Sequence, residues 1–373
     1  MYRPVDARED RRHMARALEL AKRGLYTTDP NPRVGCVMVR DTQVVGEGWH
    51  EYAGGPHAEI SALARAGESA RAATAYVTLE PCCHQGRTGP CTEALIRAGV
   101  RRVVAAMEDP NPQVAGQGLR LLEAGGILVE CGVLEREART LNVGFVSRMR
   151  HGRPFVRCKL AMSLDGRTAM ATGESQWITG GPARRDVQRL RARSSAILTG
   201  IGTVLADDPS LTVRWQELNE SPTPVRQPLR VVLDPQLQIS PSARLLQLPG
   251  RTLIVTTGDP GYRRIKRLAA GAEVVPLPGT PDAIDLSALM TLLADRAVNE
   301  VLLESGATLS GAMLRAGLID ELVIYAAPIL LGSTARGLFQ LPELHRMEQR
   351  IALKINDIRA VGEDWRITAQ IQD

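Results

Sequence analysis

The sequence predicts an α/β protein built from two domains, and three observations support this. The chain has 373 residues, which is long for one hydrophobic core and sufficient for two. Strand-like and helix-like segments alternate along both halves, a pattern typical of mostly parallel sheets covered by helices. Between the halves lies a polar segment, 148–154, that contains glycine and proline. We therefore expect a first domain at 1–149 and a second at 150–373.

The first half begins with a helix at 10–24, because Met14, Ala17, Leu18 and Ala21 recur at helical spacing. Apolar runs rich in valine then predict strands, and amphipathic runs between them predict helices. In chain order we expect strands at 34–39 and 44–49, a helix at 57–66, a strand at 73–79, a helix at 92–99, a strand at 101–107, a helix near 117–124, a strand near 127–131 and a helix near 134–142.

The second half repeats the alternation but not the motifs of the first. Seven strands are expected, at 155–162, 195–200, 230–234, 252–257, 273–277, 300–304 and 321–328. Helices are expected at 183–193, 285–296 and 308–316. The end of the chain, 350–372, has the pattern of two further strands, and the proline-rich stretch 216–228 predicts a loop.

Composition narrows the class of protein. No run of eighteen apolar residues occurs, and the charged N-terminus lacks the apolar core of a secretory signal, so we expect a cytoplasmic protein. The net charge of +5 comes from arginines dispersed among acidic residues, and aromatic residues make up only 3% of the chain. A nucleic-acid surface would need a basic stripe with aromatic stacking residues, so we expect a small phosphorylated substrate instead.

The most informative residues are His57, Glu59, Cys82 and Cys91. One histidine and two cysteines can bind a catalytic zinc with an open fourth position, where a water molecule would become acidic near pH 7. The order His-x-Glu followed by Pro-Cys and a second cysteine is typical of zinc deaminases that act on nucleobases. This chain departs from that signature because eight residues, rather than two, separate Cys82 from Cys91.

Helix ends explain how these residues could meet. Pro56 favours a helix start, so His57 and Glu59 fall in a first turn, and Cys91 after Pro90 opens the next helix. A thiolate is favoured at such a helix end. Glu59 would then take a proton from water and return it to a leaving amine, without binding the metal.

Two alternatives remain open for the metal. Cys83 or His84 could complete a closed, structural four-ligand site, or Cys83 could replace Cys82 as a ligand. For the function, the alternatives are a tRNA-type nucleic-acid deaminase with an accessory domain and a zinc-stabilised ligand-binding protein without turnover.

Longer motifs occur in a fixed order along both halves. They are TTDPNPRVGCV (27–37), GEGWH (46–50), PHAEI (56–60), TLEPCCHQGRTGPC (78–91), EDPNPQVAGQG (108–118), KLAMSLDGRTA (159–169), GESQWITG (173–180), TGIGTVLADDPSLTVR (199–214) and LLESGATLSGAML (302–314). Together they resemble the family of bifunctional deaminase/reductases of riboflavin biosynthesis, over nearly the whole chain.

The resemblance implies a cytidine-deaminase-like, three-layer α/β/α first domain and a dihydrofolate-reductase-like α/β second domain. The first would hydrolyse the 2-amino group of 2,5-diamino-6-(5-phosphoribosylamino)pyrimidin-4-one, with Zn²⁺. The second would reduce the ribosyl side chain to ribityl with NADPH. A homo-oligomer is a further expectation, with no nucleic acid or membrane as partner.

The resemblance also implies site residues. In the deaminase, Asn31 and His50 would line the pyrimidine pocket and Arg87 would contact the phosphate, although Asn31 also suits a plain turn and Arg87 a solvated loop. In the reductase, the resemblance gives Ser175, Arg191, Leu211, Arg214 and Glu304 as substrate residues. Lys159 is added because it is a polar residue near the end of the first expected strand of the second half, where such sheets bind ligands. The expected cofactor residues are Ala161, Trp177, Thr203, Asp207, Gly306, Ala307, Thr308, Leu309, Ser310 and Gly311.

Overall fold

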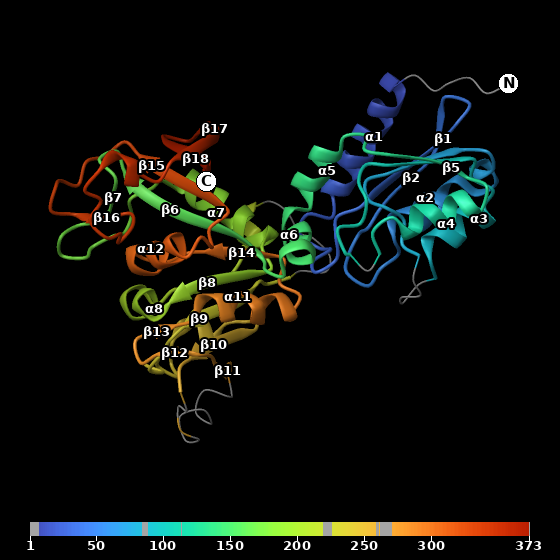
Figure 1. Ribbon diagram of the computed structural model, residues 1–373. Helices are drawn as coiled ribbons and strands as arrows, with labels where there is room; N and C mark the ends of the chain where they lie inside the picture. Colours follow the sequence, from blue (N-terminus) through green and yellow to red (C-terminus); the bar gives the residue numbers. More distant parts are fainter. Residues whose placement is uncertain are drawn as a thin grey trace. The chain divides into compact units, whose positions relative to one another are not determined.

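The computed structural model describes residues 7–83, 89–112, 114–218, 226–258, 261 and 271–372 (Figure 1). These residues form two compact units, the first ending at Gly152 and the second beginning at Arg153. The position expected for the domain boundary, 149/150, falls inside helix α6 (Val143–His151). No helix among the described residues is both long and apolar enough to cross a membrane.

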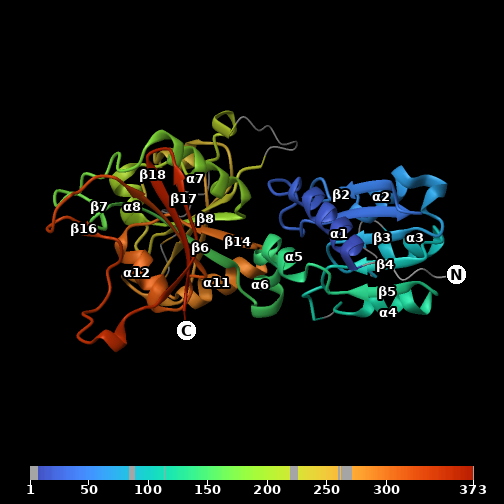
Figure 2. The same cartoon turned by 90° about the horizontal axis from the view of Figure 1, so that it is seen from above.

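The first unit contains a five-stranded mixed sheet in the order β2-β1-β3-β4-β5 (Figure 2). Its strands are β1 (Gly35–Arg40), β2 (Gln43–Trp49), β3 (Thr74–Val77), β4 (Arg102–Ala105) and β5 (Leu128–Cys131). Strands β3, β4 and β5 run parallel, whereas β1 is antiparallel to both of its neighbours. The helices are α1 (Ala7–Lys22), α2 (Ala58–Ala66), α3 (Cys91–Arg97), α4 (Gln117–Ala124), α5 (Glu135–Leu141) and α6, with a short 3₁₀ turn at Gly67–Ala70.

Helices cover both faces of this sheet, which gives the expected three-layer α/β/α arrangement. On one face, α2, α3 and α4 pack against alternate strand residues such as Met38 and Val103. On the other face, α1 and α5 pack against Val37, Tyr76 and Val104. The alternation follows from the two-residue period of a strand.

The second unit is built on a nine-stranded sheet in the order β11-β10-β9-β8-β14-β6-β15-β18-β17. Its strands are β6 (Phe155–Ser163), β8 (Ala196–Gly200), β9 (Leu229–Leu233), β10 (Thr252–Thr256), β11 (Glu273–Pro276), β14 (Glu300–Leu303), β15 (Glu321–Ala327), β17 (Leu353–Val361) and β18 (Asp364–Ile371). In this order the strands from β11 to β15 are parallel, and the hairpin β17–β18 joins antiparallel. Two small ribbons, β7–β16 (Arg167–Ala169 and Arg336–Gly337) and β12–β13 (Gly279–Thr280 and Ala283–Ile284), lie apart from the main sheet.

Helices again lie on both faces of the large sheet. Helices α11 (Leu286–Asp295) and α12 (Ala307–Arg315) pack on one face. Helices α7 (Gly181–Arg193), α8 (Ile201–Asp207) and α9 (Arg244–Gln247) pack on the other. Short 3₁₀ turns occur at Trp215–Leu218 and Met347–Gln349. The α/β class is therefore confirmed for both halves.

Candidate active sites

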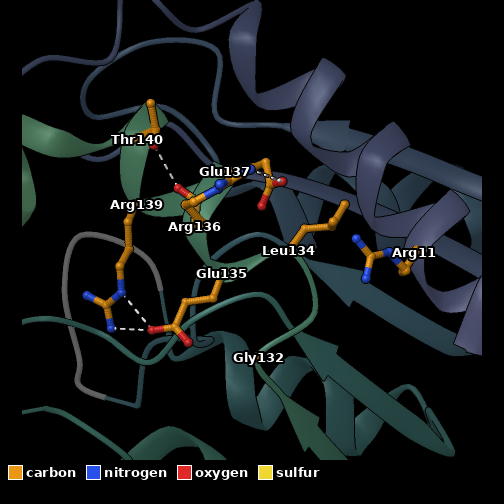
Figure 3. A pocket seen from close by; sticks show the side chains of 8 residues that line it. All are labelled: Arg11, Gly132, Leu134, Glu135, Arg136, Glu137, Arg139 and Thr140. Atoms are coloured by element: carbon orange, nitrogen blue, oxygen red, sulfur yellow. Dashed lines mark hydrogen bonds and ion pairs between the residues drawn. The ribbon is translucent and has the colours of Figure 1, made fainter. Parts of the chain in front are cut away.

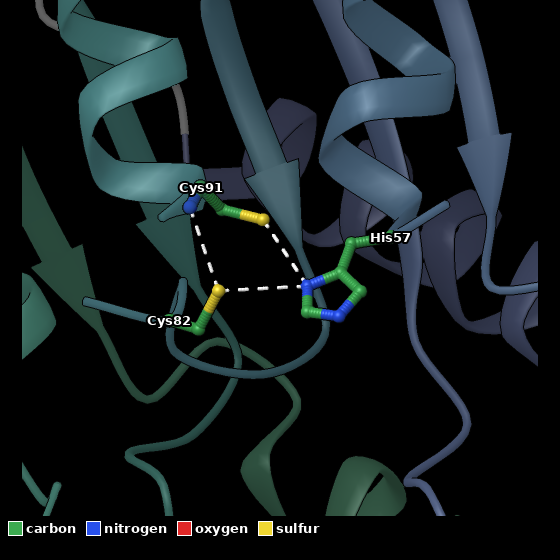
Figure 4. Close-up of side chains that lie close together, drawn as sticks. All are labelled: His57, Cys82 and Cys91. Carbon is green, nitrogen blue, oxygen red and sulfur yellow. Dashed lines mark hydrogen bonds between the residues drawn. The ribbon is translucent and has the colours of Figure 1, made fainter. Parts of the chain in front are cut away.

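Three side chains from separate elements converge in the first unit (Figure 4). His57 is the residue that precedes α2, and Cys91 is the first residue of α3. Cys82 lies on the segment that leaves the carboxyl end of β3. Their potential ligand atoms all lie within 4.8 Å of one another, and among the described residues this is the one group of three or more such side chains.

The imidazole of His57 presents Nδ1 to both sulfurs. Nδ1 lies 3.5 Å from Sγ of Cys82 and 3.3 Å from Sγ of Cys91, and the backbone N–H of Cys91 donates to Sγ of Cys82 at 3.4 Å. The group contains Cys82 and leaves out Cys83. His84, the other alternative fourth ligand, lies outside the described residues.

The donor atoms of the cluster suit a divalent cation. A hydrogen bond with Cys91 lowers the pKa of the Cys82 thiol against the effect of burial, so a thiolate is favoured there. The same hydrogen bond and burial raise the pKa of the Cys91 thiol. Two sulfurs with one imidazole nitrogen are ligands that zinc prefers. The residues present therefore fit a zinc ion.

Glu59 lies in the first turn of α2, outside the cluster of three, and is only 3% exposed. Burial raises the pKa of Glu59 to about 7, and the negative charge on Cys82 acts in the same direction. A carboxyl group in this state can both accept and donate a proton near neutral pH. It is therefore suited to acid–base work rather than to metal binding.

Helix α2 is held against β2 by glycines that permit a close approach. A Cβ on Gly48 would lie 2.3 Å from the carbonyl oxygen of Ala58, and one on Gly46 would lie 2.4 Å from that of Ala62. Since real Cβ atoms do not come so close, only glycine lets the strand and the helix pack at this distance. This packing fixes the helix end that presents His57 and Glu59.

Asn31 and His50 lie beside the cluster, as their expected role in the pyrimidine pocket requires. Nδ1 of His50 lies 2.9 Å from the carbonyl oxygen of Pro56, so it carries the proton and donates it. Nε2 then accepts from the amide of Asn31 at 3.1 Å. The ring of His50 stands edge-on to that of His57, with centroids 5.6 Å apart. Arg87 lies outside the described residues.

In the second unit, Lys159, Arg191 and Glu304 form one ion-paired group. Arg191 donates from Nε and Nη2 to the two carboxylate oxygens of Glu304, at 2.6 and 3.0 Å. Nζ of Lys159 lies 3.4 Å from the same carboxylate. Burial alone would raise the pKa of Glu304, but the charges of Arg191 and Lys159 outweigh it and lower the pKa to about 2. Three of the expected substrate residues are thus brought together.

Leu211 and Arg214 are connected to this group by two other residues. These are Thr212 and Gln188, which the sequence did not indicate. Arg191 also donates to the carbonyl oxygen of Thr212, and the side-chain oxygen of Gln188 accepts from the backbone N–H of Arg214 at 3.0 Å. Leu211 is buried with a φ of +46°, a strained conformation for a non-glycine residue. Gln188 could have been found from its helical spacing of three residues from Arg191. Ser175 is half-buried on the loop before α7.

Of the expected cofactor residues, Gly306 to Gly311 lie at the start of α12 and Thr203 lies in the first turn of α8. Gly306 precedes α12 and a Cβ there would meet no atom within 4 Å, so a ligand can approach this helix end. Thr203 lies in α8 and Asp207 at its exposed end, while Ala161 lies in β6. Ser310 and Gly311 are buried, and Thr308 donates to the side chain of Gln340 at 2.9 Å.

These starts follow neighbouring strands. A Cβ on Gly200, the last residue of β8, would lie 3.5 Å from Cδ2 of Leu309, which places the start of α8 beside α12. Carboxyl ends of parallel strands and helix starts are where α/β sheets bind phosphorylated ligands. Trp177 is 70% exposed, and its ring lies 4.8 Å from the guanidinium of Arg184. The start of α12 therefore fits a phosphate group of a nicotinamide cofactor, and Trp177 lies at the surface.

A separate surface hollow of about 650 Å³ lies over α5 and near Arg11 of α1 (Figure 3). Its charged side chains on α5 are paired with one another, with Arg139 donating to Glu135 at 2.6 Å and Arg136 lying 3.8 Å from Glu137. None of the site residues described above lines it. We assign it no part in the chemistry.

The chain is similar to known proteins along almost its whole length. Residues 7–107 match the family model "Cytidine and deoxycytidylate deaminase zinc-binding region", and residues 154–367 match "RibD C-terminal domain". The riboflavin biosynthesis protein RibD of Escherichia coli is 53% identical over 362 residues, which cover 95% of this chain and 98% of the relative. That of Haemophilus influenzae is 50% identical, with 95% of each chain covered.

Solved structures agree with these relatives. RibD of Acinetobacter baumannii superposes with a TM-score of 0.91 at 46% identity, covering 99% of this chain and 100% of the other. A diaminohydroxyphosphoribosylaminopyrimidine deaminase/5-amino-6-(5-phosphoribosylamino)uracil reductase of Thermotoga maritima superposes with a TM-score of 0.85 at 32% identity, covering 98% and 99% of the two chains.

Proposed function

Because this chain belongs to the RibD family of riboflavin biosynthesis proteins, we propose that His57, Cys82 and Cys91 bind the zinc ion of its deaminase and that Glu59 is the acid–base residue. The chain is a bifunctional enzyme of riboflavin biosynthesis, with a zinc-binding deaminase domain and a reductase domain that uses a nicotinamide cofactor. The residues, the exact substrates and the choice of NADPH are our proposals.

The substrate that we propose for the deaminase is 2,5-diamino-6-(5-phosphoribosylamino)pyrimidin-4-one, the type of compound after which the Thermotoga deaminase/reductase is named. Zinc, when bound, supplies an acidic water for hydrolysis of the 2-amino group. The Glu59 carboxylate takes up a proton and delivers it to the nitrogen of the leaving ammonia. Asn31 holds an edge of the pyrimidine through its side-chain amide, oriented by Nε2 of His50. Arg87 is proposed to contact the phosphate.

One observation supports this proposal most strongly. Nδ1 of His57 lies within 3.5 Å of both sulfurs, and Glu59 stands buried in the same helix turn without joining the cluster. In a structural zinc site closed by four protein ligands, the buried carboxyl group of Glu59 would have no catalytic role. The sequence and the geometry therefore favour a catalytic zinc with an open position.

For the second step, we propose NADPH as cofactor and the deaminated pyrimidine as substrate. The cofactor supplies a hydride that reduces the ribosyl side chain to ribityl. Gly306 to Gly311, at the start of α12, would hold a cofactor phosphate, with Ala161, Trp177, Thr203 and Asp207 around it. Lys159, Glu304 and Arg191 would orient the sugar, and Ser175, Leu211 and Arg214 would hold its phosphate arm. The protein's task is to hold the reacting carbon close to the nicotinamide.

The substitution Glu59→Gln tests the deaminase assignment in the full-length protein. We expect the variant to keep its zinc and to lose ammonia release on the order of 10²–10⁴-fold, which is the usual contribution of a positioned acid–base group. Reduction of the deaminated pyrimidine, followed by NADPH absorbance, should be unchanged, and the retained zinc serves as the control for the folding of the first unit. A variant that keeps zinc and deaminates at the wild-type rate would remove Glu59 from this role.

We also propose that the protein acts in the cytoplasm on small molecules alone, as a homo-oligomer without nucleic acid or membrane partners. The six free cysteines suit a reducing compartment. Strand β17 is an outer edge of the large sheet, and Leu353, Ile355, Ile358 and Trp365 share one face of the β17–β18 hairpin at 42% to 55% exposure. Exposed apolar edges of this kind are usually covered, and a two-fold dimer would pair the patch with itself.

A further inference from the structure

One buried acid in the deaminase unit has no part in the chemistry described so far. Glu80 lies on the segment that leaves β3, two residues before Cys82, and is 3% exposed. A buried carboxylate needs compensation for the water it has lost, usually through several hydrogen bonds. The partners of Glu80 therefore indicate what it does.

The Glu80 carboxylate accepts four hydrogen bonds, all from backbone N–H groups of the segment that leads into α4. Oε2 accepts from Asp109 and Gly116, each at 2.9 Å. Oε1 accepts from Gly118 at 2.7 Å and from Leu119 at 3.4 Å. Hydrogen bonds to a charged acceptor are stronger than those to a neutral one. This single side chain therefore fixes Asp109 and the start of α4, residues 116–119, to the chain just before Cys82.

A second contact joins the same two segments from the other side. A Cβ on Gly118 would lie 2.2 Å from the carbonyl oxygen of Pro81. The start of α4 therefore packs directly against Pro81, the residue between Glu80 and Cys82. The backbone N–H of Glu80 also donates to the carbonyl oxygen of Met107 at 2.9 Å. Beyond Pro81, the carbonyl oxygen of Cys82 accepts from the N–H of Thr92 in α3 at 3.2 Å. Cys82 is thus held from both directions along the chain.

We propose that Glu80 is a positioning residue for the zinc site, which holds Cys82 in place by binding the backbone of Asp109 and of residues 116–119. The inference rests on the ligand set proposed above. Groups behind the ligands of a metal site typically change metal affinity 10–100-fold when they are altered. Glu80 acts through the main chain rather than through a bond to the sulfur, so its substitution should loosen Cys82 without removing any ligand.

Two variants disturb this contact from opposite sides in the full-length protein. Glu80→Gln keeps the shape of the side chain but leaves only one oxygen acceptor and turns an NH₂ group toward two N–H donors. Gly118→Ala introduces a methyl group where Pro81 leaves no room. Thermal unfolding of the first unit, followed by the fluorescence of Trp49, reports whether the first unit of each variant is folded.

Asp10→Asn provides a matched control. Asp10 is also buried in the first unit, and its carboxylate accepts two hydrogen bonds from Arg102 and one from Tyr76, each at 2.8 Å. Arg102 begins β4, whereas Cys82 follows the carboxyl end of its parallel neighbour β3, so the ion pair between Asp10 and Arg102 lies at the opposite end of the strands. The control loses comparable hydrogen bonds without touching the Cys82 segment.

The measurement is the dissociation constant for zinc, by competition with a chelator, together with the absorption spectrum of the cobalt-substituted protein. We expect Glu80→Gln and Gly118→Ala to raise the dissociation constant on the order of 10–100-fold and to alter the cobalt–thiolate bands. Asp10→Asn should lower the melting temperature and leave both readouts unchanged. Wild-type zinc affinity and spectrum in Glu80→Gln, or an equal loss in Asp10→Asn, would overturn the inference. A wild-type protein that binds no zinc would instead overturn the proposed ligand set.

Discussion

Two buried glutamates, one in each unit, have pKa values that are shifted in opposite directions. Burial raises the pKa of Glu59 to about 7, and the negative sulfur of Cys82 adds to this effect. Glu304 is buried as well, but the positive charges of Arg191 and Lys159 lower its pKa to about 2. For two buried carboxyl groups, the sign of the neighbouring charge therefore makes the difference. Glu59 can therefore accept and donate a proton near neutral pH, whereas Glu304 stays negatively charged.

The lowered pKa of Glu304 makes a prediction about acid stability. Its unfolded pKa is near 4.5, so the stabilisation is complete above that pH and is lost as the pH falls toward 2. We expect the advantage of the wild type over Glu304→Gln, in free energy of urea unfolding, to shrink by on the order of 3 kcal/mol across this range. Tryptophan fluorescence is a suitable signal, because Trp177, Trp215 and Trp365 lie in the second unit.

The exposed Glu343 offers a control for this measurement, since its side chain is 89% exposed. Glu343→Gln should follow the wild type at every pH. An advantage over Glu304→Gln that stays constant from neutral to acid pH would show that Glu304 is not held charged by its two partners.

At the scale of elements, the deaminase site depends on how closely α2 lies on β2. Gly48→Ala would place a methyl group against the carbonyl oxygen of Ala58 and the N–H of Ala62, and the helix would have to move. We expect a loss of about 1–3 kcal/mol in the free energy of unfolding, as for overpacked cores. Because the moving helix end presents His57 and Glu59, zinc affinity should fall as well.

Gly337→Ala is the matched control, because its Cβ would meet no atom within 4 Å. It should leave both the stability and the zinc affinity of the protein unchanged. If Gly48→Ala lost stability while its zinc affinity remained that of the wild type, the helix position would not control the site as we describe.

The spacing of apolar residues predicts most helices and strands. For helices α6 and α8, which it does not predict, there are physical reasons. The α2 and α11 segments repeat apolar residues at helical spacing, and β10 and β14 are short apolar runs. The sequence does not predict helix α6, because its last turn, Arg148 to His151, is polar and has the composition of a linker. Its basic residues suit a helix C-terminus, and Gly152 adopts the left-handed conformation that ends it. The sequence does not predict helix α8, because only Val204 of its seven residues is buried and the helix therefore has no continuous buried apolar face.

At the scale of the whole molecule, the two chemistries lie in separate compact units, so the loss of metal should affect one of them. We expect removal of zinc by a chelator to abolish ammonia release while reduction of the deaminated pyrimidine continues at the wild-type rate. The first unit should also become less stable, because a ligand that binds only the folded state contributes about 4 kcal/mol at a thousandfold excess over its dissociation constant. Added zinc should restore both properties. Equal loss of both activities on chelation would contradict this division.

The exposed face of the β17–β18 hairpin makes a prediction about assembly. Ile358→Lys places a charge in the middle of the apolar patch and should convert a dimer to a monomer in light scattering after size-exclusion chromatography. Leu121→Lys, at a residue that is 49% exposed on α4, is the control and should not change the mass. A monomeric wild type, or a dimer that tolerates Ile358→Lys, would exclude this surface as the interface.

The two sites differ in how far the sequence predicts them. His57, Cys82 and Cys91 lie close along the chain and have the chemistry of a metal site, so their grouping could be predicted from residue type and spacing. The contact between Arg191 and Glu304 joins residues 113 positions apart, and only the family resemblance suggested it. The role of Glu80 could not be predicted, because its partners are backbone N–H groups, which leave no pattern of side chains in the sequence.

The most direct test of the central claim is zinc X-ray absorption spectroscopy on the active, full-length protein. We expect one zinc per chain with two sulfurs at about 2.3 Å, one imidazole nitrogen and one oxygen that does not come from the protein, at about 2.0–2.2 Å. A zinc enclosed by four protein ligands, or an active deaminase without zinc, would contradict it.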